Sequence, residues 1–238
     1  MGVIIQNTEV TASSTMGTGS INVSGCTNAG FNRKLVMVAI QIKDPTTPGS
    51  PDLIFDYGGS GTVLTNTLNN YSDYGPGYFR ITIGYLDNPP VGTYTNRAEW
   101  GTSGVSSVIC WCLSNAKTGI NIAADSESSS GVNGVNFVYA AGDIGDLILT
   151  SCSATCHDGE GAGYFALDSM SGAYGVTKYT SVIHTNGAIG HGHKYYPNKG
   201  TETIGWSVSS SRSSYFTSMF MGAVGIKAAA IGKHGMHP

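Results

Sequence analysis

The sequence predicts an all-β protein: an antiparallel two-sheet β-sandwich, jelly-roll-like, with about ten to twelve strands and no substantial helix. Three observations support this class. Apolar residues recur with period two between turn residues, and glycine reaches 34 of 238 residues. Charged residues make up only 11% of the chain. Ser, Thr, Asn and Gly must therefore form much of the surface, as in turn-rich β proteins.

The first expected strands cover residues 35–42, 52–57, 62–64, 78–86, 94–100 and 105–113. Residues 35–42 are apolar on both faces, which is typical of a central strand. In 78–86 the residues Phe79, Ile81 and Ile83 alternate with smaller or polar ones. Pro89 and Pro90 follow, and they end this strand because proline cannot donate a ladder hydrogen bond.

The second half continues the pattern with expected strands at 135–141, 146–152, 176–185, 204–208 and 215–227. No amphipathic helix separates these segments, and parallel strands would need such crossovers. Antiparallel sheets are therefore expected throughout. The remaining long stretches, 45–51, 115–133 and 186–200, are expected to be loops.

The domain organisation is expected to be simple. No linker divides the chain and no internal repeat is apparent. We expect a single β-sandwich domain over 1–227 and a C-terminal tail over 228–238, where the alternation ends.

Charge and hydropathy exclude several partner classes. The net charge is −3, and the 12 Lys and Arg residues are scattered, so we expect no nucleic-acid partner. No run of 18 apolar residues exists, so we expect no membrane helix. The N-terminal residues lack a basic region followed by an apolar stretch, so no secretory signal is expected.

Five cysteines leave at least one thiol unpaired. Cys110 and Cys112 flank Trp111 and should share one face of a strand. We expect buried free thiols that pack as small hydrophobic groups. The alternative is a disulfide between this strand and Cys152.

The expected loop at 186–200 carries His191, His193, Tyr195 and Tyr196 among glycines. We interpret these four residues as a possible surface contact loop. His191 and His193 could also form half of a metal site, but no CxxC or HxxxH spacing accompanies them. Neither a metal nor a cofactor is expected.

Catalytic signatures are missing from the sequence. Pairs of acids such as Asp143 and Asp146 lie in turns, where carboxylates are commonly solvated. There is no GxSxG nucleophile motif, and the glycine-rich stretches do not lead into a helix. We therefore expect a protein that is not an enzyme.

Thirteen tyrosines among Gly, Ser and Asn residues suit recognition surfaces and stacking on sugar rings. This composition supports a second functional class, a glycan-binding module or adhesin that uses Tyr195, Tyr196 and Trp206. The other interpretation is that most of these rings pack at strand ends and expose only their hydroxyl groups to solvent.

Several segments, in order, resemble a β-sandwich module of phage virion proteins and bacterial surface proteins. They are Arg33-Lys34-Leu35-Val36-Met37-Val38, Phe55-Asp56-Tyr57-Gly58-Gly59, residues 83–93, residues 142–149, residues 205–212 and residues 223–228. The resemblance covers about residues 3–230. It consists of core-strand and turn residues and therefore implies a fold but no site. The 186–200 segment and the tail depart from the module.

The resemblance and the missing export signal together lead to the expected function. We expect a bacteriophage virion structural protein, most simply a capsid decoration (cement) protein that stabilises the shell by contacts between subunits. Its partners would be the major capsid protein or other virion proteins. The chain itself would form a homo-oligomer, with a trimer favoured, and host-surface glycans would be a further partner. It would lie on the virion exterior after assembly in the host cytoplasm.

Overall fold

The computed structural model describes residues 2–13, 19–43, 47–74, 77–120, 122–130, 133–157, 164–165, 169–184, 187–209 and 216–230. These residues form eighteen strands and no helix. The described residues therefore include no helix that could span a membrane. The strands are β1 (Ile4–Ser13), β2 (Ser20–Asn28), β3 (Lys34–Lys43), β4 (Asp52–Phe55), β5 (Thr62–Val63), β6 (Thr65–Tyr74), β7 (Gly77–Asp87), β8 (Gly92–Glu99), β9 (Val105–Ser114), β10 (Ile122–Ser130), β11 (Gly134–Gly142), β12 (Leu147–His157), β13 (Tyr164–Phe165), β14 (Ser169–Ala173), β15 (Thr177–His184), β16 (Gly187–Tyr195), β17 (Gly200–Ser209) and β18 (Phe216–Ile226).

The all-β antiparallel class is confirmed, but the described strands form four sheets rather than two. The first inner sheet has the order β1-β9-β3-β7-β6, and the first outer sheet has the order β2-β8-β4-β5. The second inner sheet has the order β10-β18-β12-β16-β15, with β13 paired to β12, and the second outer sheet is β11-β17-β14. The expected ten to twelve strands were too few because polar strands such as β10, inside the expected 115–133 loop, carry little apolar signal.

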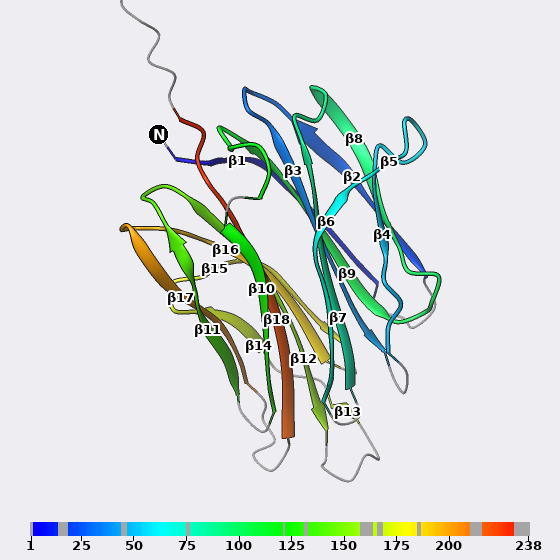
Figure 1. The fold of residues 1–238 in the computed structure, drawn as a ribbon. Helices are drawn as coiled ribbons and strands as arrows, with labels where there is room; N and C mark the ends of the chain where they lie inside the picture. Colours follow the sequence, from blue (N-terminus) through cyan, green and yellow to red (C-terminus); the bar gives the residue numbers. More distant parts are fainter. Residues whose placement is uncertain are drawn as a thin grey trace, which may run out of the picture.

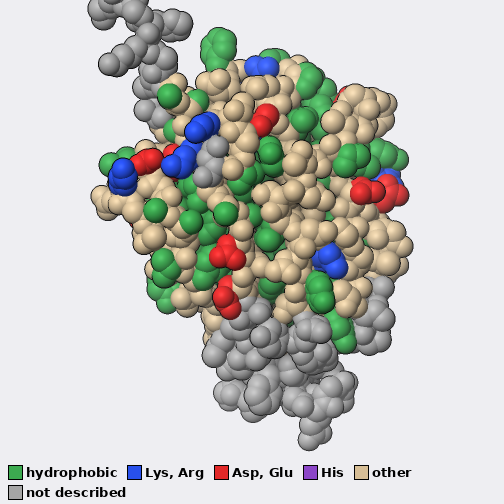
Figure 2. All heavy atoms as spheres, in the orientation of Figure 1, with side chains coloured by type: hydrophobic (Ala, Val, Ile, Leu, Met, Phe, Trp, Pro, Cys, Tyr) green, Lys and Arg blue, Asp and Glu red, His purple; other side chains and the backbone are tan. Residues whose placement is uncertain are grey.

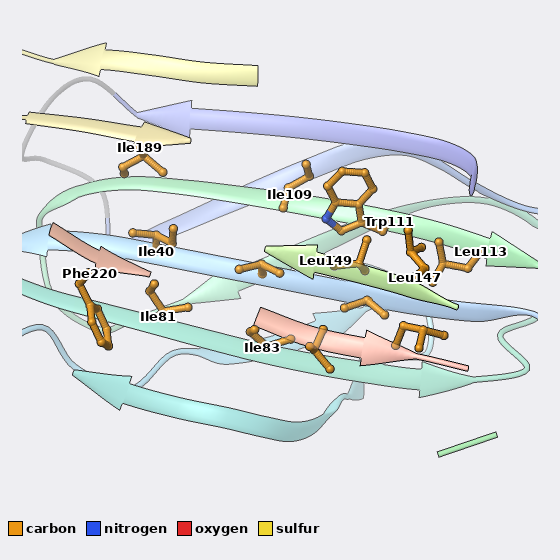
Figure 3. Close-up of a cluster of buried hydrophobic side chains, with 14 of the residues drawn as sticks. Ile40, Ile81, Ile83, Ile109, Trp111, Leu113, Leu147, Leu149, Ile189 and Phe220 are labelled. Atoms are coloured by element: carbon orange, nitrogen blue, oxygen red, sulfur yellow. The ribbon is translucent and has the colours of Figure 1, made fainter. Parts of the chain in front are cut away.

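The four sheets stack as layers with three apolar cores between them (Figure 1). Alternate residues of β3 face opposite ways: Leu35 packs toward the first outer sheet, and Val36 toward the second inner sheet. The central core joins the two inner sheets, with Ile40, Ile81 and Trp111 on one side and Leu149 and Phe220 on the other (Figure 3). Because both faces of each inner sheet are covered, their central strands read as continuous apolar runs.

The two halves of the chain repeat one topology. Strands β1, β9, β3, β7 and β6 correspond in order to β10, β18, β12, β16 and β15. The outer strands β2 and β8 likewise correspond to β11 and β17. Each half is thus a jelly-roll-like sandwich, and the chain contains an internal structural duplication. The sequence did not reveal it, because the repeat conserves strand pairing rather than residue identity.

The two halves are related by an approximate two-fold axis. Across the central core β1 lies over β15, β9 over β16, β3 over β12, and β6 over β10. The strand order of one inner sheet is thus reversed in the other, which requires an axis parallel to the strands, between β3 and β12. Such an axis keeps corresponding loops at one end of the molecule.

The duplication does not decide how many units unfold. The large shared core links the halves, and the expected single unit over 1–227 stays a prediction. Of the expected tail, residues 228–230 lie within the described part and 231–238 lie outside it.

Candidate functional site

The four residues predicted as a surface loop lie on or next to strand β16. The prediction of a loop over 186–200 was therefore wrong for residues 187–195, which form this strand. His191 and Tyr196 are buried, while His193 is half-buried and Tyr195 is exposed. The prediction of a shared contact surface is corrected accordingly. The glycine-rich sequence misled because Gly190 and Gly192 are strand residues that leave room for the Trp206 ring.

His191 forms a polar bridge inside the central core. Its Nε2 lies 2.8 Å from Ser107 Oγ on β9, and its Nδ1 lies 2.7 Å from Ser151 Oγ on β12. Burial lowers the pKa of His191 to about 3, so the ring is neutral at pH 7. A neutral imidazole donates from one nitrogen and accepts at the other, so one serine accepts and the other donates. The bridge joins the two halves.

The approximate two-fold axis shows how specific this bridge is. The strand registers place Ile83 at the position corresponding to His191, and Phe220 at the position corresponding to Ser107. Both equivalents are apolar core residues. The positions of His191 and Ser107 are therefore polar, while the corresponding positions carry hydrocarbon side chains.

A series of aromatic ring contacts runs from the buried Trp111 to the surface. Trp111 makes edge contacts with Tyr179 at 5.7 Å and with His193 at 5.8 Å between ring centroids, and His193 contacts Tyr195 at 5.7 Å. Trp111 Nε1 and His193 Nδ1 are buried without a hydrogen-bond partner among the described residues. Burial lowers the pKa of His193. At the surface the chain presents the rings of Tyr179 and Tyr195, which are 46% and 39% exposed.

Two of the three aromatic residues predicted for glycan binding are inaccessible. Tyr196 is buried, and its hydroxyl donates to the Ala140 carbonyl oxygen. Trp206 is also buried, and its Nε1 donates to Thr150 Oγ1 at 3.2 Å. The glycan interpretation can therefore use only Tyr195 from the original group.

The described cysteines are buried free thiols, as predicted. Cys110 and Cys112 share one face of β9 and point toward Cys26 in the first outer core, whereas Cys152 lies in the second outer core. The alternative disulfide with Cys152 is wrong, because two inner sheets separate these cores. Burial raises the pKa of Cys110 and Cys152, so both are protonated at neutral pH. The side chain of Cys156 lies outside the described residues.

His191 and His193, which could have formed half of a metal site, gain no further ligands in the described part of the chain. No group of three metal-ligating side chains that could hold a metal ion occurs among those residues. Asp146 is buried and accepts hydrogen bonds from the backbone N–H groups of Asp143 and Ala228, both at 2.9 Å, so it holds a turn. Asp158 and Glu160, the side chain of His157, and His234 and His237 lie outside the described residues.

The feature that sequence reasoning missed is one end of the molecule, which we call the loop end. It consists of residues 29–33, 88–91, 115–120, 143–146, 196–199 and 227–230. Phe31 is 88% exposed, Ile144 is 71% exposed and Val91 is 66% exposed. Phe31 and Ile144 occupy corresponding positions in the two halves, since each precedes a positive-φ residue, Asn32 or Gly145, at the start of an inner strand.

The loop end also contains a depression of about 510 Å³. Its lining residues are Asn32, Ala116, Lys117, Thr118, Asp143, Lys227, Ala228, Ala229 and Ala230. In Figure 2 charged side chains gather at the upper left, while wide areas of this face are uncharged. An isolated apolar residue in a sequence gives no signal of exposure, so only the folded loops reveal this site.

Comparisons with known proteins give a weak likeness and no family. No protein-family model matches the chain, and no curated protein matches it. A chain from the atomic structure of Sulfolobus Turreted Icosahedral Virus is 12% identical, with 96% of this chain and 91% of that chain covered and a TM-score of 0.29. A chain from the structure of infectious bursal disease virus Gt strain is 11% identical, with coverages of 98% and 78% and a TM-score of 0.13. These values describe a weak structural similarity to chains of virus structures.

Proposed function

We propose that this chain is a structural protein of a bacteriophage virion, and specifically a capsid decoration (cement) protein. The observation that carries the proposal is the pair of exposed apolar tips, Phe31 and Ile144, at corresponding positions of the loop end. Large apolar side chains this exposed commonly mark contact sites. A decoration protein binds across joints between subunits, and its binding free energy adds to the stability of the assembled shell.

The architecture suits this role. Four stacked sheets make a rigid block, and the internal duplication offers two similar tips on one end of it. Two tips can engage two similar sites on a repeating surface, so each binding event raises the effective concentration for the other. A homotrimer at three-fold positions would repeat these contacts by symmetry, and the protein would lie on the virion exterior after assembly in the host cytoplasm.

Mass spectrometry of purified particles of the encoding virus tests the proposal. We expect this chain among the virion proteins, in stoichiometric amount. Its absence from the particles would overturn the proposal. A second measurement locates the contact. The double variant Phe31→Asp with Ile144→Asp should lower particle occupancy at least tenfold. The control Tyr57→Asp, a change at an exposed ring outside the loop end, should leave the occupancy unchanged.

A glycan-binding role is a second candidate, favoured by the exposed rings of Tyr179 and Tyr195 beside strand β1. Aromatic rings with free faces can stack on sugars. A glycan array with the purified protein tests it. Binding of a defined sugar that is lost in Tyr195→Ala would support this role, and an array without signal would overturn it.

A further inference from the structure

We propose that the depression at the loop end binds an acidic, extended segment of a partner protein, with its carboxylates held by Lys117 and Lys227. This inference rests on the proposed function, because it names the chemistry of the partner at the same end of the molecule. It adds a charge requirement that the apolar tips alone do not provide.

The floor of the depression is fixed by backbone hydrogen bonds. The segment that follows β9 and the segment that follows β18 meet here in a short antiparallel bridge between Ala116 and Ala228. Lys117 N donates to the Lys227 carbonyl oxygen, and Ala229 N donates to the Asn115 carbonyl oxygen, both at 2.8 Å. The two lysines therefore have fixed backbone positions on adjoining segments of the chain.

Small side chains keep the depression open. Ala116, Ala228, Ala229 and Ala230 line it, and each has only a methyl group as its side chain. An extended segment can therefore approach the floor closely and bury apolar atoms against these methyls.

The charges at this end do not balance. Asp143 lies 3.4 Å from Lys227 and 3.7 Å from Lys199, so one carboxylate faces two lysines. Lys117 adds a third cation to the rim, and the nearby Asp146 is buried and bonded to the backbone. Within the whole loop end, Arg33 and these three lysines face the carboxylates of Asp143 and Asp146 only, which leaves an excess of two positive charges in a chain whose net charge is −3. A segment with two carboxylates supplies the complementary charge.

The test uses a fluorescein-labelled hexapeptide with two carboxylate side chains and one leucine. Its neutral counterpart has Asn and Gln in place of Asp and Glu. In an anisotropy titration of the full chain we expect the acidic peptide to bind at least tenfold more tightly than the neutral one. The difference should shrink at 0.5 M salt, since screening weakens exposed ion pairs. Equal binding of the two peptides would overturn the inference.

Variants locate the site. Lys117→Glu with Lys227→Glu should weaken binding of the acidic peptide at least tenfold, and the milder pair Lys117→Gln with Lys227→Gln should weaken it less. Ser103→Glu, at the opposite end of the sandwich, adds a negative charge and should leave binding unchanged. Unchanged binding in both lysine pairs would overturn the inference. Salt-sensitive self-association through these lysines, seen by sedimentation, would overturn it in favour of a second copy as the occupant.

The particle assay separates this inference from the function on which it rests. If the lysine variants fail to bind the peptide but occupy particles normally, the acidic-segment inference is overturned and the virion role stands. If the wild-type chain binds the peptide but is absent from particles, the virion role is overturned instead.

Discussion

The hydroxyl of Tyr179 donates a hydrogen bond of 2.7 Å to the carbonyl oxygen of Thr8, across the two halves of the chain. Strand β1 is an edge strand of the first inner sheet, and β15 is an edge strand of the second. The bond occupies a carbonyl group of β1, and an exposed strand edge with free carbonyls invites pairing with other chains. Tyr179 therefore joins the halves and occupies one carbonyl group of the edge strand β1.

We expect Tyr179→Phe to lower the free energy of unfolding by about 1 kcal/mol, because it removes one hydrogen bond and keeps the ring. Hydrogen exchange of the β1 amides should become faster in the same variant. Tyr174→Phe is the matched control, since this residue is 55% exposed and the loss of its hydroxyl should change neither measurement. An unaltered β1 exchange rate in Tyr179→Phe would show that the bond does not hold the edge.

The ion pair between the buried Lys34 and the partly exposed Asp87 anchors the connection between the halves. Lys34 Nζ binds Asp87 and donates to the Gly119 carbonyl oxygen at 2.9 Å, and Gly119 N donates to Asp87 Oδ2 at 2.6 Å. Asp87→Ala should cost about 3 kcal/mol because it leaves a buried cation without its partner. Lys34→Met should cost less, since it removes that charge. Urea unfolding of both variants compares them, and a larger loss in Lys34→Met would contradict this account.

The pH dependence of stability should contain a contribution from His191. Its pKa is about 3 in the folded protein and about 6.5 when unfolded, so the unfolded state alone takes up a proton between these values. The contribution of the neutral His191 to the free energy of unfolding is fully present above pH 6.5 and is lost as the pH falls toward 3. Between pH 6.5 and 5 the loss should be about 2 kcal/mol.

His191→Gln separates this contribution from that of the carboxylates. The variant should be less stable than the wild type at pH 7.5, and the difference should shrink by about 2 kcal/mol at pH 5. Urea unfolding at the two pH values measures it. A difference that stays constant with pH would contradict the assignment.

The shared central core predicts that the two halves unfold together. Calorimetry should give one transition, with equal calorimetric and van't Hoff enthalpies. Leu149→Ala should lower the midpoint of that transition by removing buried contacts, at a cost of about 2–5 kcal/mol. Two resolved transitions, with only one shifted by Leu149→Ala, would show that the halves are separate cooperative units.

The strands of the inner sheets could be predicted closely from the sequence. Residues 35–42 and 105–113 fall within β3 and β9, because a strand buried on both faces needs an unbroken apolar run. Polar edge strands such as β10 could not be predicted, because a sequence of small and polar residues with one solvent-facing side resembles that of a loop.

The sequence by itself determined the class of this protein: antiparallel β-structure follows from period-two apolar residues and turn residues, which are local signals. Only the tertiary structure decided that there are four layers, that the halves repeat, and that His191 lies in a core while Phe31 and Ile144 lie at the surface. The physical reason is that burial depends on which sheet covers a strand. That pairing joins residues far apart in the chain, and no local pattern records it.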